Sequence, residues 1–171
     1  MRRLLFLLLV LALGVGPAAA QDWIEYRPPG GGYRVEFPGK PQVSTRDVTT
    51  RTAVIQMNMA MVERGDAAAF LTIHSQRPPG SSSVDPQQVL DQVRDGVLKD
   101  PERKLREEAH TTVGGLPARR VIIDIPQKNQ VSVALFVLGA DRMYQAIVVV
   151  APGQESSADI ERFLKSFTVM E

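Results

Sequence analysis

Cysteine is absent from the whole chain, and histidine occurs only twice. The absence of cysteine excludes a disulfide framework, and it also excludes a lipid anchor attached to an N-terminal cysteine. Two histidines without any cysteine leave few ligands for a metal centre of the usual imidazole and thiolate kind. We therefore expect no metal and no cofactor. The length of 171 residues is sufficient for one domain.

A face with a single sign of charge is also lacking. Basic and acidic residues alternate along the chain, for example within residues 91–95 and 100–104. Binding to a nucleic-acid backbone requires a basic stripe that releases counterions. The charge pattern therefore predicts that nucleic acid is not a partner.

The N-terminus has the pattern of a secretory signal peptide. Arg2 and Arg3 precede an apolar run of about twelve residues, and small alanines end at Ala20. Because a membrane span needs roughly twenty apolar residues, a cleaved signal is favoured over an uncleaved anchor, and no span is expected after cleavage. We predict cleavage between Ala20 and Gln21 and a periplasmic or secreted product. The chain has 20 basic and 19 acidic residues, and two of the basic residues lie in the signal. Cleavage therefore changes the formal net charge from +1 to −1.

Periodicity divides the remaining chain into an arm and one α+β domain. Residues 21–32 end in Pro-Pro-Gly-Gly-Gly and are expected to form a flexible arm, and residues 33–171 are expected to form the domain. Period-two patterns and turn residues predict strands, and helical spacing after Asp85 predicts a helix with an N-terminal cap. The expected strands cover residues 33–37, 42–48, 52–62, 68–75, 104–113, 118–125, 131–138, 143–150 and 166–170, and the expected helices run from 86 to 99 and from about 157 to 165.

The stretches 131–138 and 143–150 are almost continuously apolar. The four residues between them are too few for a helical crossover, so the pair is predicted to be an antiparallel hairpin that is buried on both sides. This predicts an antiparallel sheet sandwiched between helices, in an α/β/α arrangement.

Several short motifs resemble the Mog/PsbP-like superfamily. They are Gly-Gly-Tyr-x-Val-x-Phe-Pro-Gly-Lys-Pro at 31–41, Gly-Gly-Leu-Pro-Ala-Arg at 114–119, Arg-Phe-Leu-Lys-Ser-Phe at 162–167, and the arm with Trp23 and Tyr26. The resemblance implies an antiparallel sheet between helices, no shared catalytic motif, and an exported accessory role with a protein partner. It carries over no functional residues.

The weak binding candidates are two aromatic residues and two histidines. Trp23 and Tyr26 lie on the arm, where they could dock a partner or roof a pocket, although packing against their own domain is favoured. His74 and His110 lack the spacing of metal ligands, so exposed or singly hydrogen-bonded side chains are favoured over ligands or bases. Met57, Met59 and Met61 alternate along one strand, and that face is either core or a Cu(I) site.

Two functions remain open from the sequence. The first is an exported, non-catalytic accessory or protein-interaction module, because no nucleophile, acid–base pair or metal motif is present. The second is a periplasmic carrier of a small molecule or lipid, in which the apolar hairpin 131–150 and a flanking helix enclose a pocket. A cavity in that layer would favour the carrier.

Overall fold

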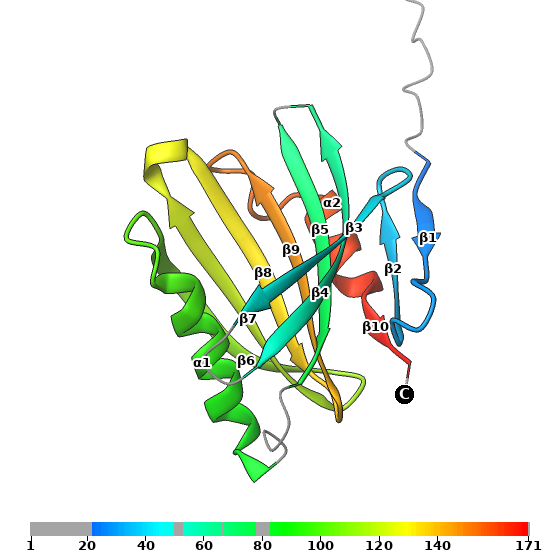
Figure 1. Cartoon of the computed structure of the whole chain (residues 1–171). Helices are drawn as coiled ribbons and strands as arrows, with labels where there is room; N and C mark the ends of the chain where they lie inside the picture. The colour runs from blue at the N-terminus through cyan, green and yellow to red at the C-terminus, as the bar shows by residue number, and fades with distance from the viewer. Residues whose placement is uncertain (1–21, 50–52, 66, 78–82, 171) are drawn as a thin grey trace, which may run out of the picture.

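The computed structural model describes residues 22–49, 53–65, 67–77 and 83–170. Strands dominate these residues, with one helix in the middle of the chain and one near its end (Figure 1). The strands are β1 (Ile24–Tyr26), β2 (Tyr33–Phe37), β3 (Gln42–Thr49), β4 (Val54–Arg64), β5 (Ala68–Gln76), β6 (Lys104–Val113), β7 (Leu116–Ile125), β8 (Gln130–Leu138), β9 (Arg142–Val150) and β10 (Thr168–Val169). The α-helices are α1 (Pro86–Leu98) and α2 (Ala158–Ser166), and a 3-10 turn spans Pro126–Lys128.

Seven strands form one antiparallel sheet in the order β3-β4-β5-β9-β8-β7-β6. The predicted hairpins are confirmed, and their turns use glycine where the backbone has positive φ: Gly65 between β4 and β5, and Gly114 between β6 and β7. The β8–β9 hairpin lies inside the sheet and has buried side chains on both faces, as its continuous apolar sequence predicts.

A second sheet consists of β1, β2 and β10. The sequence predicts that residues 21–32 form a flexible arm, but the described part of that arm contains β1, which pairs along β2 from Ile24–Phe37 to Tyr26–Val35. β10 pairs with the other edge of β2. Three residues are too few to distinguish a strand from a loop by periodicity, which is why the pattern alone misses β1.

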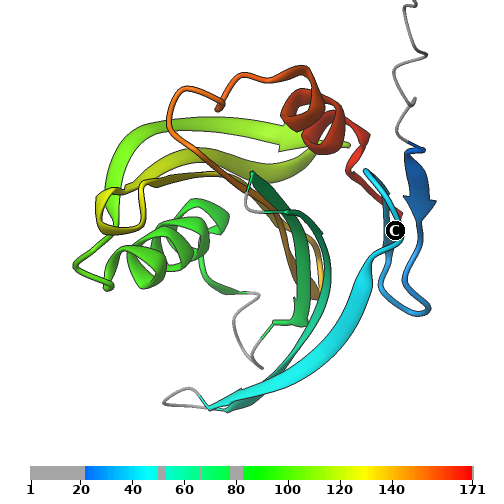
Figure 2. The same cartoon turned by 90° about the horizontal axis from the view of Figure 1, so that it is seen from above.

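The large sheet is strongly curved, with α1 inside the curve and α2 and the small sheet outside it (Figure 2). We call these the inner and the outer face. The inner core holds Leu90 of α1 with Val121, Phe136 and Leu138 of the sheet, all nearly or fully buried. The outer core packs β2 and α2 on the sheet through side chains such as Phe37 and Phe163, whose ring centroids are 5.2 Å apart.

The expected antiparallel α+β sheet is confirmed, but its helical cover is narrower than an α/β/α sandwich. On the outer face α2 shares the cover with the small sheet, and on the inner face α1 contacts mainly β7 and β8. The inner face of β4 and β5 is left largely half-buried, with Met59, Met61 and Ile73 partly accessible, and the inner face of β3 is mostly exposed. The fold therefore leaves a concave surface beside α1.

α1 begins as its sequence predicts. The Asp85 carboxylate accepts hydrogen bonds from the backbone N–H groups of Gln87 and Gln88 at 2.9 and 3.2 Å, with Pro86 at the first helical position. Helical spacing then places Leu90 on the sheet, and Val89, Val93 and Val97 along the border of the inner core.

Candidate functional site

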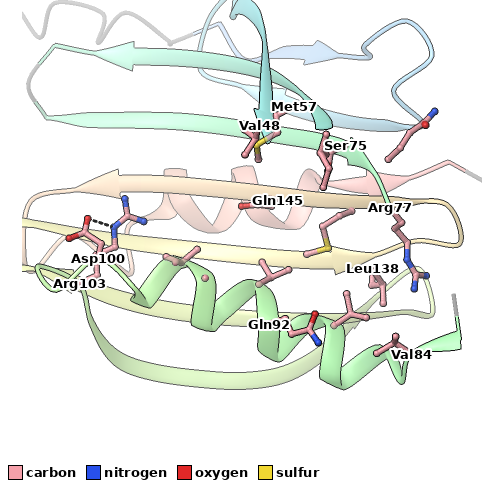
Figure 3. A pocket seen from close by; sticks show the side chains of 17 residues that line it. Val48, Met57, Ser75, Arg77, Val84, Gln92, Asp100, Arg103, Leu138 and Gln145 are labelled. Atoms are coloured by element: carbon pink, nitrogen blue, oxygen red, sulfur yellow. Dashed lines mark ion pairs between the residues drawn. The ribbon is translucent and has the colours of Figure 1, made fainter. Parts of the chain in front are cut away.

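A groove of about 670 Å³ lies on the inner face between α1 and the half-buried strands. It follows α1 from Val84, just before the helix, to Asp100, just after it (Figure 3). A volume of this size falls in the range of small-molecule sites. The lining residues are mainly apolar: Val48, Ile55, Met57, Val84, Val89, Val93, Gly96, Val97, Leu138 and Met143, with Ser75, Gln76, Arg77, Gln92, Asp100, Arg103 and Gln145 as the polar members.

Strand alternation explains why apolar side chains line the groove. Ala60 and Val62 of β4 belong to the outer core, so Met57, Met59 and Met61 point to the inner face. Met57 lies opposite Ser75 of β5, which lies opposite Met143 of β9. The three methionines of β4 are therefore neither fully buried core nor solvent-exposed, and Met57 forms part of the groove wall. Thioethers suit a wall that adapts to ligand shape.

A charged network holds the far side of α1 against the sheet. Arg119 of β7 is fully buried, and its guanidinium is hydrogen-bonded to the Asp91 carboxylate and, at 2.9 Å, to the Gln87 side-chain oxygen. Its Nη1 also lies 2.8 Å from Glu108 of β6, and Arg94 reaches the same carboxylate at 2.9 and 3.0 Å. The hydrogen bond from Arg119 is the main cause that lowers the pKa of Asp91. The network attaches α1 to β6 and β7. Because α1 is one wall of the groove, the network also positions that wall.

A second hollow, of about 520 Å³, lies where β4 begins and β5 ends, and shares Ile55, Gln76 and Arg77 with the groove. Strand alternation places its residues Gln56, Asn58 and His74 on the outer face of the sheet, opposite the groove. Its other walls are mainly polar. Its remaining lining residues are Gly30, Ala53, Val54, Gln56, Asn58, His74 and Arg142. We call it the polar pocket.

His74, a candidate from the sequence, lies in the polar pocket. Its ring stacks edge-on against Tyr33 at 5.5 Å, and its Nδ1 is buried without a hydrogen-bond partner. Burial and then the nearby Arg142 charge lower the pKa of His74. His110 lies elsewhere, exposed on the edge strand β6 opposite Arg119. The structure therefore does not bring the two histidines together.

Trp23 and Tyr26 pack against the body of the protein. The Trp23 ring meets Phe70 edge-on at 6.1 Å and carries the Arg162 guanidinium 4.5 Å from its centroid. Tyr26 contacts Tyr33 and Phe37, with ring centroids 6.5 and 5.8 Å apart. Both side chains are half-buried on the outer face, away from the groove. Both aromatic residues of the arm therefore pack against their own domain, which is the arrangement that the sequence favours.

Across residues 22–49, 53–65, 67–77 and 83–170, no group of three or more His, Asp or Glu side chains is arranged to hold a metal ion. None of the helices within the described ranges is both long and apolar enough to span a bilayer. The predicted cleavage site at Ala20 and Gln21 lies outside the described residues. The groove and the polar pocket both offer space for a ligand. The sequence predicts a cavity between the 131–150 hairpin and a helix, but the contributions of β3, β4 and β5 to the walls come from segments far apart in the chain and are not predicted.

The curved antiparallel sheet, with a helix inside the curve and a helix and small sheet outside, defines a PsbP-like fold. The solution structure of cyanobacterial PsbP (CyanoP) from Synechocystis sp. PCC 6803 is similar, with a TM-score of 0.54 and 12% identity over 90% of this chain and 96% of that one. A Pseudomonas aeruginosa protein of unknown function, described as a putative regulator, gives a TM-score of 0.46 and 12% identity over 78% and 85% of the two chains. No protein-family profile and no curated protein matches the sequence. The resemblance predicted from the sequence therefore holds for the fold.

Proposed function

We propose that this chain is an exported, non-catalytic binding domain that carries a small apolar molecule in the inner groove. The observation that supports it is the groove itself, which lies beside the apolar β8–β9 hairpin and a flanking helix. The sequence predicts that a carrier would have its cavity between this hairpin and a helix, so a groove at this place favours a carrier over an accessory module. Release of water from the valine and methionine side chains of the wall supplies the driving force for binding.

The first test measures binding of a neutral fluorescent apolar probe, N-phenylnaphthylamine, to purified protein that begins at Gln21. Gly96 lies on the groove side of α1, and a Cβ added there has no atom within 4 Å. Gly96→Phe therefore extends a ring into the groove from a position with room for its Cβ, and is expected to abolish probe binding. Gln88→Phe, on the exposed side of the same helix, is the matched control and should leave binding unchanged.

Two outcomes would contradict the carrier proposal. One is a wild-type protein that binds no probe, and the other is a Gly96→Phe variant that binds as well as wild type. Native mass spectrometry of the protein purified from its own exporting cell extends the test, because a bound lipid or metabolite adds its mass. The same spectrum tests export, since a signal cleaved after Ala20 leaves a chain that starts at Gln21.

A second candidate, the PsbP-type protein-interaction module, is supported by the edge strand β3. Within the described residues β3 pairs only with β4, so its other edge offers main-chain groups to an added strand. Val43 on this strand is 62% exposed. If this module is the function, Val43→Pro should prevent capture of a partner, while Gly96→Phe should not.

A further inference from the structure

We propose that the groove binds an uncharged, largely apolar molecule with a carbonyl or hydroxyl group inside its apolar body, and that Ser75 and Gln145 hydrogen-bond that group. The inference rests on the proposed function, because it names the class of ligand for the same groove. It follows from two polar side chains that lie within an otherwise apolar wall.

Ser75 places a buried hydroxyl in the wall of the groove. The residue is 9% exposed and lies on the inner face of β5, in one row with Met57 of β4 and Met143 of β9. Within the described residues its hydroxyl has no hydrogen-bond partner. Thr72, the other buried hydroxyl of β5, is hydrogen-bonded at 2.7 Å to the hydroxyl of Tyr33 in the outer core. Because buried polar side chains are usually hydrogen-bonded, a partner for Ser75 is expected from a molecule in the groove.

Gln145 brings a second polar group to the same place. It is half-buried on β9, opposite Ile73 and two residues from Met143, so it is a diagonal neighbour of Ser75 across the β5–β9 ladder. Diagonal neighbours in antiparallel strands have Cα atoms roughly 7–8 Å apart, which a long side chain can span. Its side-chain amide also has no partner among the residues that the structure describes. One polar atom of a ligand above this diagonal can therefore meet both side chains.

These two polar groups lie in the middle of the groove. Figure 3 shows them between one end that carries Asp100 and Arg103 and another that carries Arg77. The other uncharged polar lining residues, Gln76 and Gln92, are exposed. A ligand that reaches the two buried groups therefore has apolar parts on both sides of its polar group.

The charged side chains of the wall interact with groups of the protein itself. Asp100 and Arg103 form an ion pair at 3.2 Å. Arg77 donates hydrogen bonds to the main-chain carbonyl oxygens of Gly139 and Ala140 at 3.2 and 3.3 Å. All three charged residues lie toward the ends of the groove (Figure 3). An ionised group in the middle would lose its hydration without meeting an opposite charge, so the ligand is uncharged there.

The hydrogen-bonding capacity of the two side chains defines the group that fits. A serine hydroxyl both donates and accepts, and a glutamine amide has a donor NH₂ and an acceptor oxygen. A ligand carbonyl can accept from both side chains, whereas a ligand hydroxyl can donate to one and accept from the other. The shared chemistry is an uncharged oxygen, and the experiment separates the two forms.

The test compares five compounds that share two phenyl rings and differ at the carbon between them. This carbon bears no polar group in diphenylmethane, a carbonyl in benzophenone, a hydroxyl in benzhydrol, a carboxylate in diphenylacetate and a cationic amine in benzhydrylammonium. Each is titrated against wild-type protein loaded with N-phenylnaphthylamine. Benzophenone, benzhydrol or both are expected to displace the probe at concentrations at least about threefold lower than diphenylmethane, and the two ions are expected to be weakest. Diphenylmethane is the most apolar of the five, so a groove without polar recognition would bind it best.

Variants locate the polar group of the ligand. Ser75→Ala and Gln145→Leu each remove one hydrogen-bonding group and keep the wall apolar. Each should lower the preference for the better oxygen compound over diphenylmethane by at least about twofold. Ser44→Ala is the matched control and should keep the preference, because Ser44 lies exposed on the inner face of β3 and outside the groove lining. An unchanged preference in both groove variants would overturn the assignment to Ser75 and Gln145.

The outcomes separate this inference from the proposed function. If neither oxygen compound reaches the stated preference over diphenylmethane, or if an ion binds best, the uncharged polar group is wrong while the apolar carrier stands. If neither the probe nor any of the five compounds binds, the carrier itself is wrong. The wild-type comparison needs no variant, so a variant that fails to fold leaves the test intact.

Discussion

Replacing Arg119 with methionine removes the cation that holds α1 on the sheet. The side chain of Arg119 is fully buried, and it meets Asp91 and Gln87 on the helix and Glu108 on β6. Methionine retains an unbranched apolar stem of similar length, so Arg119→Met removes the charge and hydrogen bonds while creating little empty volume.

The size of the stability loss depends on which partners the neighbouring carboxylates keep once Arg119 is removed. Removal of one partner from a buried ion pair costs about 3–5 kcal/mol when the other charge is left without compensation. Here Glu108 keeps Arg94, whose Nη1 lies 2.9 Å away, and its side chain is 20% exposed. We therefore expect a loss of roughly 2–3 kcal/mol in the free energy of unfolding, below the fully buried case.

Urea unfolding followed by circular dichroism measures this loss. The matched control is Arg27→Met, because Arg27 pairs with Glu25 at 2.7 Å but both side chains are largely exposed, at 58% and 42%. This variant should stay within about 0.5 kcal/mol of wild type. Equal stabilities of Arg119→Met and wild type would refute the reasoning, since α1 would then be held by apolar contacts alone.

A pH series separates charge from packing. The hydrogen bond from Arg119 lowers the pKa of Asp91 in the folded protein. A carboxylate with a lowered folded pKa contributes stability that is present above its unfolded pKa, about 3.9, and is lost as the pH falls through the folded value. The difference between wild type and Arg119→Met should therefore shrink below about pH 4. A difference that is the same at pH 7 and at pH 3 would show that packing, and not charge, is responsible.

Three further predictions concern separate parts of the molecule. Gly96→Ala should stabilise the protein by roughly 0.5–1 kcal/mol, seen as a melting temperature higher by about 1–4 °C, because alanine favours the helix and meets no neighbour. Trp23→Ala should cost about 1–2 kcal/mol in urea unfolding, since the ring is half-buried against Phe70, and an unchanged midpoint would contradict that packing. His74 has a lowered folded pKa, first through burial and then through Arg142, so stability should fall as the pH drops below about 6.5; His74→Gln should flatten this slope, and an equal slope in both proteins would exclude His74 as its source.

The sequence predicts the elements of the large sheet because their signals are local. The Asp85 cap and the following Pro86 mark the start of α1 at the residue where it begins, and Gly65 and Gly114 mark two hairpins. Asp124 of β7 accepts hydrogen bonds from Arg106 of the adjacent strand β6. Each of these features is decided by neighbours in the chain or across one hairpin.

The arrangement of the sheets and the site are decided at longer range. Nothing local distinguishes β2, which pairs with β1 and β10, from β3, which enters the large sheet after Pro41. Likewise Met57 and Met143 are 86 positions apart in the printed sequence, yet they share one row of the inner face. The alternation of methionines predicts that they share a face, but the exposure of that face depends on how far α1 extends across the sheet.

The pairing of β2 with both β1 and β10 gives the molecule a practical polarity. Both ends of the described chain leave from the small sheet on the convex side, whereas the groove opens on the concave side (Figure 2). A tether attached after β10 would therefore hold the protein on a surface with its concave side facing outward. If the groove binds a ligand as proposed, immobilisation through the C-terminus should leave its uptake unimpeded, so that a surface-bound form of the protein could report binding.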